Sequence, residues 1–200
     1  MNNNDQTAGI NGVTVYGASS SKINRIYLEA AYNVGRILAQ HGIPVISGGG
    51  RGGIMEAAID GAISADGVTV GVLPGFMVER EWNHPGLSRT IVTDTMHERK
   101  ATMAAMSRGV IAMPGGVGTL DELFEIITWR QLKLYKGNVV ICNIGGFYDP
   151  LLTHLAHTAD EGFMRKGAPE KLWSVATTPE EAVEMALAVP SDPGIQYHLP

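Results

Sequence analysis

The 200-residue sequence contains a single cysteine, Cys142, so no disulfide can form within the chain. Cys142 lies in the apolar run 139–142, and we expect it to be an inert buried thiol in a reducing compartment. No apolar stretch approaches the roughly 20 residues that cross a bilayer. The Asn-rich residues 1–12 also lack the basic and apolar regions of a signal peptide. These absences predict a soluble, cytoplasmic protein that does not bind membranes.

Positive charge is scarce as well, with 15 Lys and Arg against 20 Asp and Glu and a formal net charge of −5. This balance opposes binding to nucleic acid, so any anionic ligand must be held by local groups. Charged residues make up only 18% of the chain, whereas 44% are hydrophobic and 25 residues are glycine. The composition excludes a disordered or coiled-coil protein and predicts one compact domain with many tight turns.

Short β-branched runs alternate with longer amphipathic stretches along the whole sequence. Most runs are apolar on both faces, which is typical of a sheet that helices cover on both sides. The predicted strands are 13–16, 44–47, 68–73, 89–93, 110–113, 139–144 and 173–176. The predicted helices are 23–42, 53–65, 96–108, 119–135, 148–162 and 179–188. This alternation predicts a single-domain, three-layer α/β/α sandwich with a doubly wound, mainly parallel sheet of about seven strands. We assign it residues 13–189, between a flexible segment (1–12) and a C-terminal tail (190–200).

Three polar or glycine-rich clusters follow predicted strands, at 17–21, 47–53 and 114–119. Ligands of doubly wound sheets bind beyond the carboxyl ends of the strands, which is where these clusters fall. Glycine lets backbone N–H groups approach an anion at a helix N-terminus, so both later clusters are candidate phosphate sites. A tight turn explains the 47–53 cluster equally well. The 114–119 cluster favours binding more strongly, because three glycines and a hydroxyl meet at one helix start.

Two common nucleotide-binding motifs are disfavoured. Gly48-x-Gly50-x-x-Gly53 matches the dinucleotide fingerprint, but no acidic residue follows about 20 positions later, where 73–75 reads Leu-Pro-Gly. Neither cluster carries the Gly-Lys-Ser/Thr of a P-loop. The sequence therefore argues against an NAD enzyme and against an ATPase.

Arg99 and Glu122 form a second candidate site. Arg99 shares a helix face with Met96, Met103 and Met106, which predicts that it points inward. A buried guanidinium needs an anionic partner, because unpaired buried charge is costly. Glu122 also has an alternative role in helix capping, because residues 119–122 match a capping box in which Thr119 caps the helix.

The motifs Met96-His97-x-Arg99-Lys100 and Pro114-Gly115-Gly116-Val117-Gly118-Thr119-Leu120-Asp121-Glu122 together resemble the signature of the LOG family. These are the cytokinin riboside 5′-monophosphate phosphoribohydrolases, whose members were often labelled "possible lysine decarboxylase". The resemblance runs from Val13 to about Val189. Two departures from the family pattern are Val117, where an aromatic residue is common, and Asp121, where glutamate is common.

The resemblance implies a Rossmann-like homodimer that hydrolyses the N-glycosidic bond of a nucleoside 5′-monophosphate, releasing free base and ribose 5-phosphate. It implies that Arg99 and Glu122 are catalytic. A prenylated adenine and the adenine of AMP both remain candidates for the base, and Glu122 could act as general base or as charge stabiliser. The expected substrate-binding residues are Ser19, Gly49, Gly50, Glu81, Lys100, Gly115, Gly116, Val117, Gly118, Thr119, Leu120 and Asp121.

Other functions fit parts of the pattern. Molybdenum-cofactor carriers are a related group that shares the fold without the hydrolase chemistry, and a nucleotide sensor would bind without turnover. A pyridoxal phosphate decarboxylase is disfavoured, because no motif identifies a Schiff-base lysine. His154 and His157 lie three apart on a predicted helix, but no further ligand completes a metal site. We therefore expect no cofactor and no metal, and we assign Trp129, Leu132 and Leu134 to a candidate dimer interface.

Overall fold

The computed structural model describes residues 7, 9–164, 167–190 and 192. Its strands form one parallel sheet in the order β4-β3-β2-β1-β5-β6-β7. All seven predicted strands are confirmed. Their bounds are β1 Gly12–Tyr16, β2 Val45–Ser47, β3 Thr69–Pro74, β4 Arg89–Thr93, β5 Ser107–Ala112, β6 Asn138–Cys142 and β7 Ser174–Ala176.

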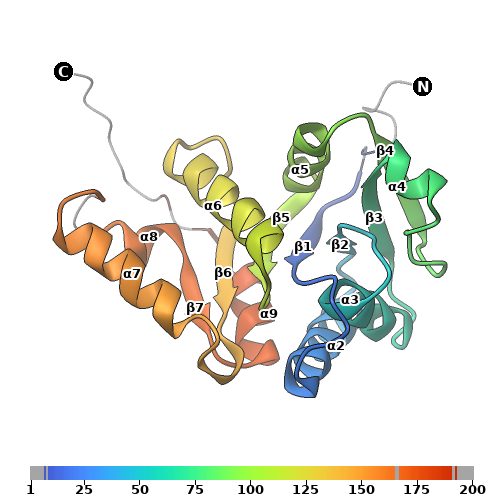
Figure 1. Cartoon of the computed structure of the whole chain (residues 1–200), viewed down its shortest axis with the longest axis horizontal. Coiled ribbons are helices and arrows are strands. Elements are labelled where there is room, and N and C mark those ends of the chain that lie inside the picture. Colours follow the sequence, from blue (N-terminus) through green and yellow to red (C-terminus); the bar gives the residue numbers. More distant parts are fainter. Residues whose placement is uncertain (1–6, 8, 165–166, 191, 193–200) are drawn as a thin grey trace.

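Helices cover both faces of the sheet (Figure 1). Helices α2 (Arg25–Gln40), α3 (Gly53–Ile63) and α9 (Pro179–Leu187) pack on one face. The opposite face carries α5 (Met96–Ala105), α6 (Val117–Gln131), α7 (Asp149–Asp160) and α8 (Pro169–Leu172). Shorter pieces are α4 (Gly75–Glu79) and the 3₁₀ turn η1 (Ile144–Gly146). The predicted three-layer, doubly wound sandwich is confirmed.

The central strand β1 shows why the predicted strands are apolar on both faces. All five of its residues are buried. Val13 and Val15 belong to the core beneath α2, α3 and α9. Tyr16 belongs to the other core, and the hydroxyl of Thr14 donates to the Met103 carbonyl of α5 at 3.3 Å. Alternate side chains therefore enter opposite cores, and polar residues on either face would lose hydration.

Cys142 is fully buried at the end of β6, as predicted. Burial raises the pKa of its thiol to about 12, because the thiolate would lose its hydration. Gly42 lies just beyond α2, where it adopts φ +68°. The Gly42 N–H donates to the Ala39 carbonyl, and the Ile43 N–H donates to the Leu38 carbonyl. These two bonds close the end of the helix.

Several predicted boundaries differ from the structure. Helix α5 ends at Ala105 rather than at 108, because Ser107 already pairs with β1 as the first residue of β5. Helix α6 begins at Val117 rather than at 119. Most residues of the predicted flexible segment and tail lie outside the described residues, and Gly12 is the first residue of β1. Within the described part of the chain, no helix combines the length and apolarity that crossing a membrane requires.

The strand order places a topological switch between β1 and β5. From β1 the chain moves outward through β2, β3 and β4, then returns to the other side of β1 as β5. The segments after β1 and β5 therefore diverge at their carboxyl ends, which opens a crevice of the kind that binds ligands in such sheets.

Candidate active site

A cleft of about 420 Å³ lies at this switch point. Its walls come from the segment after β1, the start of α6, and residues of α3, α4 and α5. The lining residues are Gly17, Ala18, Ser19, Ser20, Met55, Met77, Met96, Arg99, Gly116, Gly118, Thr119, Asp121 and Glu122.

One wall of the cleft is the N-terminus of α6. Gly116 is its N-cap, and no side chain caps the helix. The first N–H groups of a helix have no partner within the helix, so those of α6 are available to an anion in the cleft. The predicted capping role of Thr119 is wrong, because the helix starts two residues earlier and Thr119 packs against Gly115. A methyl group at Gly115 would lie 2.1 Å from the Thr119 hydroxyl.

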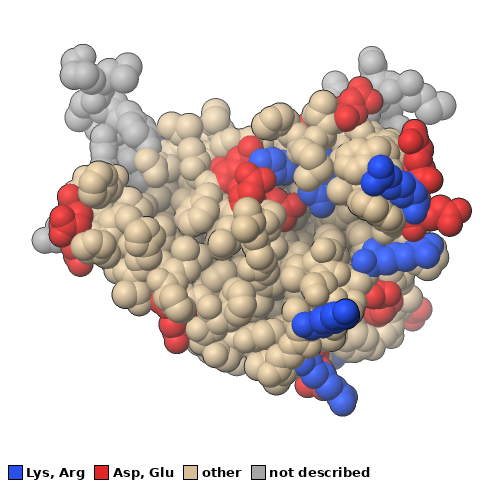
Figure 2. All heavy atoms as spheres, viewed as in Figure 1, with Lys and Arg blue, Asp and Glu red and all other residues tan. Residues whose placement is uncertain are grey.

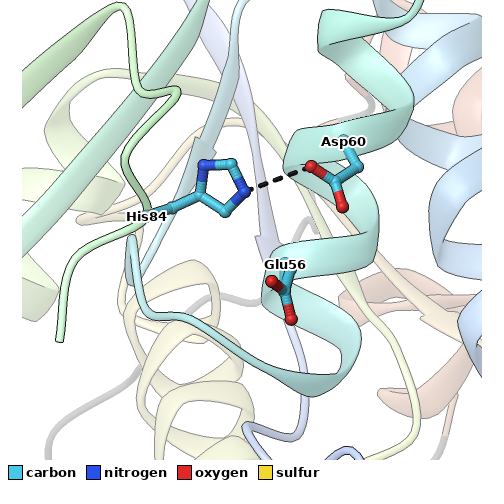
Figure 3. A group of neighbouring side chains, drawn as sticks. All are labelled: Glu56, Asp60 and His84. Atoms are coloured by element: carbon cyan, nitrogen blue, oxygen red, sulfur yellow. Dashed lines mark hydrogen bonds and ion pairs between the residues drawn. The ribbon is translucent and has the colours of Figure 1, made fainter.

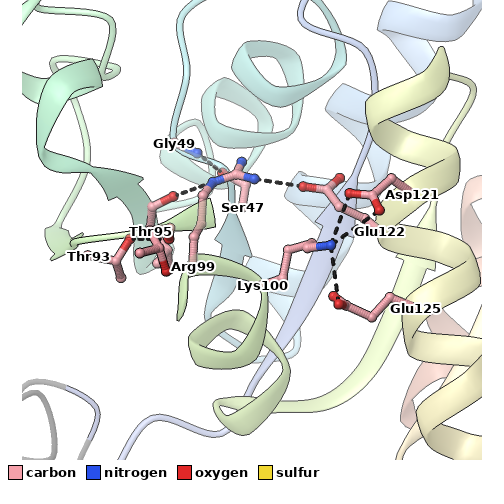
Figure 4. A network of polar contacts seen from close by, with 10 residues as sticks. Ser47, Gly49, Thr93, Thr95, Arg99, Lys100, Asp121, Glu122 and Glu125 are labelled. Carbon is pink, nitrogen blue, oxygen red and sulfur yellow. Dashed lines mark hydrogen bonds and ion pairs between the residues drawn. The ribbon is translucent and has the colours of Figure 1, made fainter. Parts of the chain in front are cut away.

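Arg99 and Glu122 meet across the cleft. Nη1 of Arg99 donates to Oε1 of Glu122 at 2.9 Å (Figure 4). Nε of Arg99 donates to the Val72 carbonyl at 2.9 Å. Arg99 is only 6% exposed, which confirms that it points inward together with the buried Met103. One glycine makes room for the guanidinium, since a methyl group at Gly48 would lie 1.9 Å from Nη2 of Arg99.

The pKa of the Glu122 carboxyl is raised above its ordinary value. Burial is the largest cause, and the Arg99 charge opposes it without offsetting it. The Arg99 charge therefore lowers the pKa of Glu122 by less than burial raises it. A carboxyl of raised pKa holds a proton more readily, which suits a group that accepts a proton from water. Burial and the nearby Glu122 charge also raise the pKa of Tyr16, so its phenol stays neutral.

Lys100 occupies an acidic pocket beside this pair. Its Nζ donates to Asp121 Oδ2 at 3.0 Å and lies 3.2 Å from Glu125 Oε1. Burial lowers the pKa of Lys100, but the hydrogen bonds to the two carboxylates raise it, and the net direction is upward. Lys100 is therefore a charged ammonium group. Figure 2 shows acidic and basic side chains meeting in the hollow between the helices that Figure 1 labels α5 and α6.

The structure brings together only part of the predicted site. The predicted residues that line the cleft are Ser19, Arg99, Gly116, Gly118, Thr119, Asp121 and Glu122. The other predicted binding residues lie outside this lining, and their contact with substrate stays a prediction: Gly49, Gly50, Glu81, Lys100, Gly115, Val117 and Leu120. Met77 of α4 also lines the cleft but was not predicted, because its place there depends on the tertiary position of α4.

Gly49 and Gly50 have another function in the fold. The Gly49 carbonyl accepts from the His84 N–H at 2.8 Å, and Gly50 forms an antiparallel bridge with Asn83. The turn after β2 thus pairs with residues 82–84 of the segment between α4 and β4. Glu81 precedes this pairing, is exposed, and adopts φ +55°.

Glu56, Asp60 and His84 place three metal-ligating atoms within 4.8 Å of one another (Figure 3). Nδ1 of His84 accepts from the Gly86 N–H at 3.0 Å, so Nε2 carries the proton and donates to Asp60 Oδ1 at 3.1 Å. A metal at Nε2 would need the lone pair that this proton occupies. The hydrogen-bond pattern therefore favours a structural contact over a metal site.

The fold and site define a class: a Rossmann-like α/β protein with an open helix N-terminus beside a buried Arg–Glu pair at the topological switch. A family model described as "Possible lysine decarboxylase" matches residues 55–186. The chain is 35% identical over 178 residues to the cytokinin riboside 5′-monophosphate phosphoribohydrolase LOG of Oryza sativa, covering 89% of this chain and 74% of that protein. The phosphoribohydrolase of Rhodococcoides fascians is 38% identical over 153 residues, with 76% and 77% covered. The chain belongs to this family, the LOG family.

Solved structures with the same fold include carriers. The molybdenum cofactor carrier protein of Chlamydomonas reinhardtii matches with a TM-score of 0.64 and 28% identity, covering 86% of this chain and 93% of that one. The molybdenum cofactor binding protein of Rippkaea orientalis has a TM-score of 0.67 at 22% identity, covers 88% of this chain and 96% of that one, and supports the fold alone.

Proposed function

We propose that this protein hydrolyses the N-glycosidic bond of a cytokinin riboside 5′-monophosphate, or of a related purine nucleotide such as AMP. The products are the free base and ribose 5-phosphate. The observation that carries the proposal is the buried Arg99–Glu122 pair, joined at 2.9 Å, in the cleft that the N-terminus of α6 borders. The names of the curated relatives support the same reaction.

In this proposal the 5′-phosphate binds at the start of α6. The N–H groups of Val117, Gly118 and Thr119 lie in the first turn after the Gly116 cap, where the helix dipole favours an anion. Glu122 follows one turn later on the same helix, so an anchored phosphate sets the distance from the ribose to its carboxylate. Anchoring a group that does not react lowers the barrier by orienting the bond that does.

The chemistry then falls to Glu122. As the bond from C1′ to the base breaks, the base takes the electron pair and the ribose develops positive charge, which a carboxylate stabilises. A water oxygen forms the new bond to C1′, and its proton passes to Glu122. Glu122 then releases that proton and the departing base takes up one proton, which completes the hydrolysis. Arg99, fixed by the Val72 carbonyl, holds the carboxylate in place.

Chromatography of reactions with AMP and with N6-isopentenyladenine riboside 5′-monophosphate tests the proposal directly. We expect free base from one or both, and poor turnover of the riboside without phosphate. Glu122→Gln and Arg99→Ala should each lower kcat by about a hundredfold or more. Saturable nucleotide binding with no base released would contradict hydrolysis.

That contrary outcome would favour a carrier or a nucleotide sensor, and the solved carrier of Chlamydomonas shares the fold. The Arg99–Glu122 pair favours the hydrolase, because binding alone does not require a buried carboxylate of raised pKa. A lysine-dependent decarboxylase is disfavoured, since the described cleft lining contains no lysine and the nearby Lys100 is a charged ammonium group.

We also propose that the protein is a homodimer, in which the end of α6 and the turn that follows it form the contact. Leu132 and Leu134 follow the end of α6 at Gln131. Leu132 is 48% exposed and Leu134 is 71% exposed. Large exposed apolar side chains close together favour a protein interface.

A further inference from the structure

His84 ties the segment between α4 and β4 to helix α3. The residue is 7% exposed, and both ring nitrogens are engaged, Nε2 with Asp60 and Nδ1 with the Gly86 N–H. Asp60 belongs to α3, which is packed against the sheet. The imidazole therefore fixes the segment to a rigid element and, through Gly86, fixes the turn that leads into β4.

The segment held by His84 in turn holds the glycine turn after β2. The His84 N–H donates to the Gly49 carbonyl at 2.8 Å, and the Arg51 N–H donates to the Trp82 carbonyl at 2.8 Å. Nε of Arg51 also donates to the Asn83 carbonyl at 2.9 Å. These bonds pair the two chain segments in one register, so a displacement of His84 is transmitted to residues 49–51.

The glycine turn borders the guanidinium of Arg99. Gly48 approaches Arg99 so closely that a methyl group there would lie 1.9 Å from Nη2 and 2.9 Å from Sδ of Met55. The N–H of Gly49 donates to the buried hydroxyl of Ser47 at 3.0 Å, which fixes the turn at the end of β2. The position of this turn therefore limits where the Arg99 guanidinium can lie.

We propose that His84, anchored by Asp60, is a positioning residue that keeps the turn 48–51 against Arg99 and so keeps Arg99 on Glu122. The kinetic consequence of this inference rests on the proposed hydrolase function, whereas the contacts of His84 are independent of that function. It also gives the Glu56, Asp60 and His84 group a role that requires no metal. Glu56 takes no part in the contact that Figure 3 draws from His84 to Asp60.

The test compares four variants of the full chain. His84→Ala and Asp60→Ala remove the anchor, whereas Asp60→Asn keeps an oxygen that can accept from Nε2 of His84. Glu56→Gln is the matched control, because it changes the third member of the group and leaves the His84 contacts intact.

We expect kcat to fall about tenfold or more in the two alanine variants, because a misplaced catalytic group is costly. KM should change by less than about threefold, since the phosphate anchor lies on α6. Asp60→Asn and Glu56→Gln should retain kcat.

A second readout does not depend on activity. Arg99 lowers the pKa of Glu122, so a displaced guanidinium should raise that pKa further. Titration of the Glu122 carboxyl by carbon NMR should therefore show a higher pKa in His84→Ala than in the wild type, and no change in Glu56→Gln.

The outcomes separate the two proposals. A wild-type protein that turns over no nucleotide contradicts the hydrolase, while the Glu122 titration still tests His84. An unchanged titration in His84→Ala, or unchanged kcat in an active enzyme, would overturn the inference. Stoichiometric Zn²⁺ binding to the wild type that disappears in Glu56→Gln would overturn it as well, because the group would then be a metal site.

Discussion

At the scale of single residues, Glu122 carries two opposing influences on its proton. Burial raises its pKa and the Arg99 guanidinium lowers it, and burial has the larger effect. The native state consequently binds this proton more readily than the unfolded chain does. A group of this kind stabilises the fold below its unfolded pKa, and the contribution is lost as pH rises through the folded pKa.

We therefore predict that wild-type stability falls, relative to Glu122→Gln, as pH rises from the ordinary glutamate pKa through the raised pKa of Glu122 in the folded protein. The glutamine variant has no such proton to lose, so the comparison reports the contribution of the Glu122 proton. Urea unfolding at several pH values measures the difference in the free energy of unfolding. A difference that stays constant across this range, or that changes in the opposite direction, would show that burial does not dominate.

Gly48 supplies a second prediction at this scale. Gly48→Ala should place a methyl group where Nη2 of Arg99 lies, and the flexible guanidinium should move away from Glu122. We expect kcat to fall about tenfold or more and stability to fall by more than about 1 kcal/mol, because the displaced guanidinium leaves a buried ion pair broken. Gly75→Ala is the matched control, since the nearest atom there is 3.8 Å away. Equal activity in the two variants would rule out this steric role.

At the scale of elements, α2 and α3 cross in very close contact. A methyl group at Gly35 would lie 1.9 Å from the Ala58 carbonyl oxygen, and one at Gly61 would lie 1.9 Å from the Tyr32 carbonyl oxygen. Each glycine therefore contacts the backbone of the opposite helix. Because α3 also presents Asp60 to His84, the position of α3 affects where the segment between α4 and β4 is held.

Gly61→Ala should accordingly destabilise the protein by about 1–3 kcal/mol, even though alanine favours helix more than glycine does. The cost comes from moving two backbones apart in a packed core. Gly118→Ala, at a helical position with open space around it, should lie within about 1 kcal/mol of the wild type. Urea denaturation of both variants checks the prediction, which fails if Gly61→Ala is as stable as the control.

Thr-x-x-Glu patterns show what local sequence can predict about these elements. At 95–98, Thr95 accepts from the Glu98 N–H at 3.1 Å, as the pattern predicts. At 119–122 the same pattern forms no cap, because the helix begins at Val117 and Glu122 binds Arg99 instead. The local pattern is identical, and the difference arises from the turn after β5 and from a partner on another helix.

At the scale of the whole molecule, the proposed dimer is open to measurement. Sedimentation equilibrium should give about twice the 21.3 kDa chain mass for the wild type. A Leu132→Asp, Leu134→Asp double variant should sediment as a monomer, because charge would be buried in the contact. Phe163→Asp, which changes an 85% exposed side chain elsewhere, should remain dimeric. A wild-type monomer at micromolar concentration would contradict the proposal.

The sequence alone determined the order and type of the main elements, the parallel sheet and the inward face of Arg99. These features follow from apolar periodicity and from the cost of burying charge, both of which act within one segment. The same reasoning extended α5 into β5, because the first residues of β5, Ser107 and Arg108, are polar and carry no apolar strand pattern.

Only the tertiary structure decided which segments meet. It joined Arg99 to Glu122 on another helix, gave the pKa of Glu122 its direction, and paired residues 82–84 with 49–51. Such contacts depend on the strand order and on the packing of α3 beneath the segment, so no local pattern encodes them. The sequence therefore indicates which residues are candidates for catalysis. Their pKa values and the contacts that hold them in place depend on distant parts of the chain that pack around them.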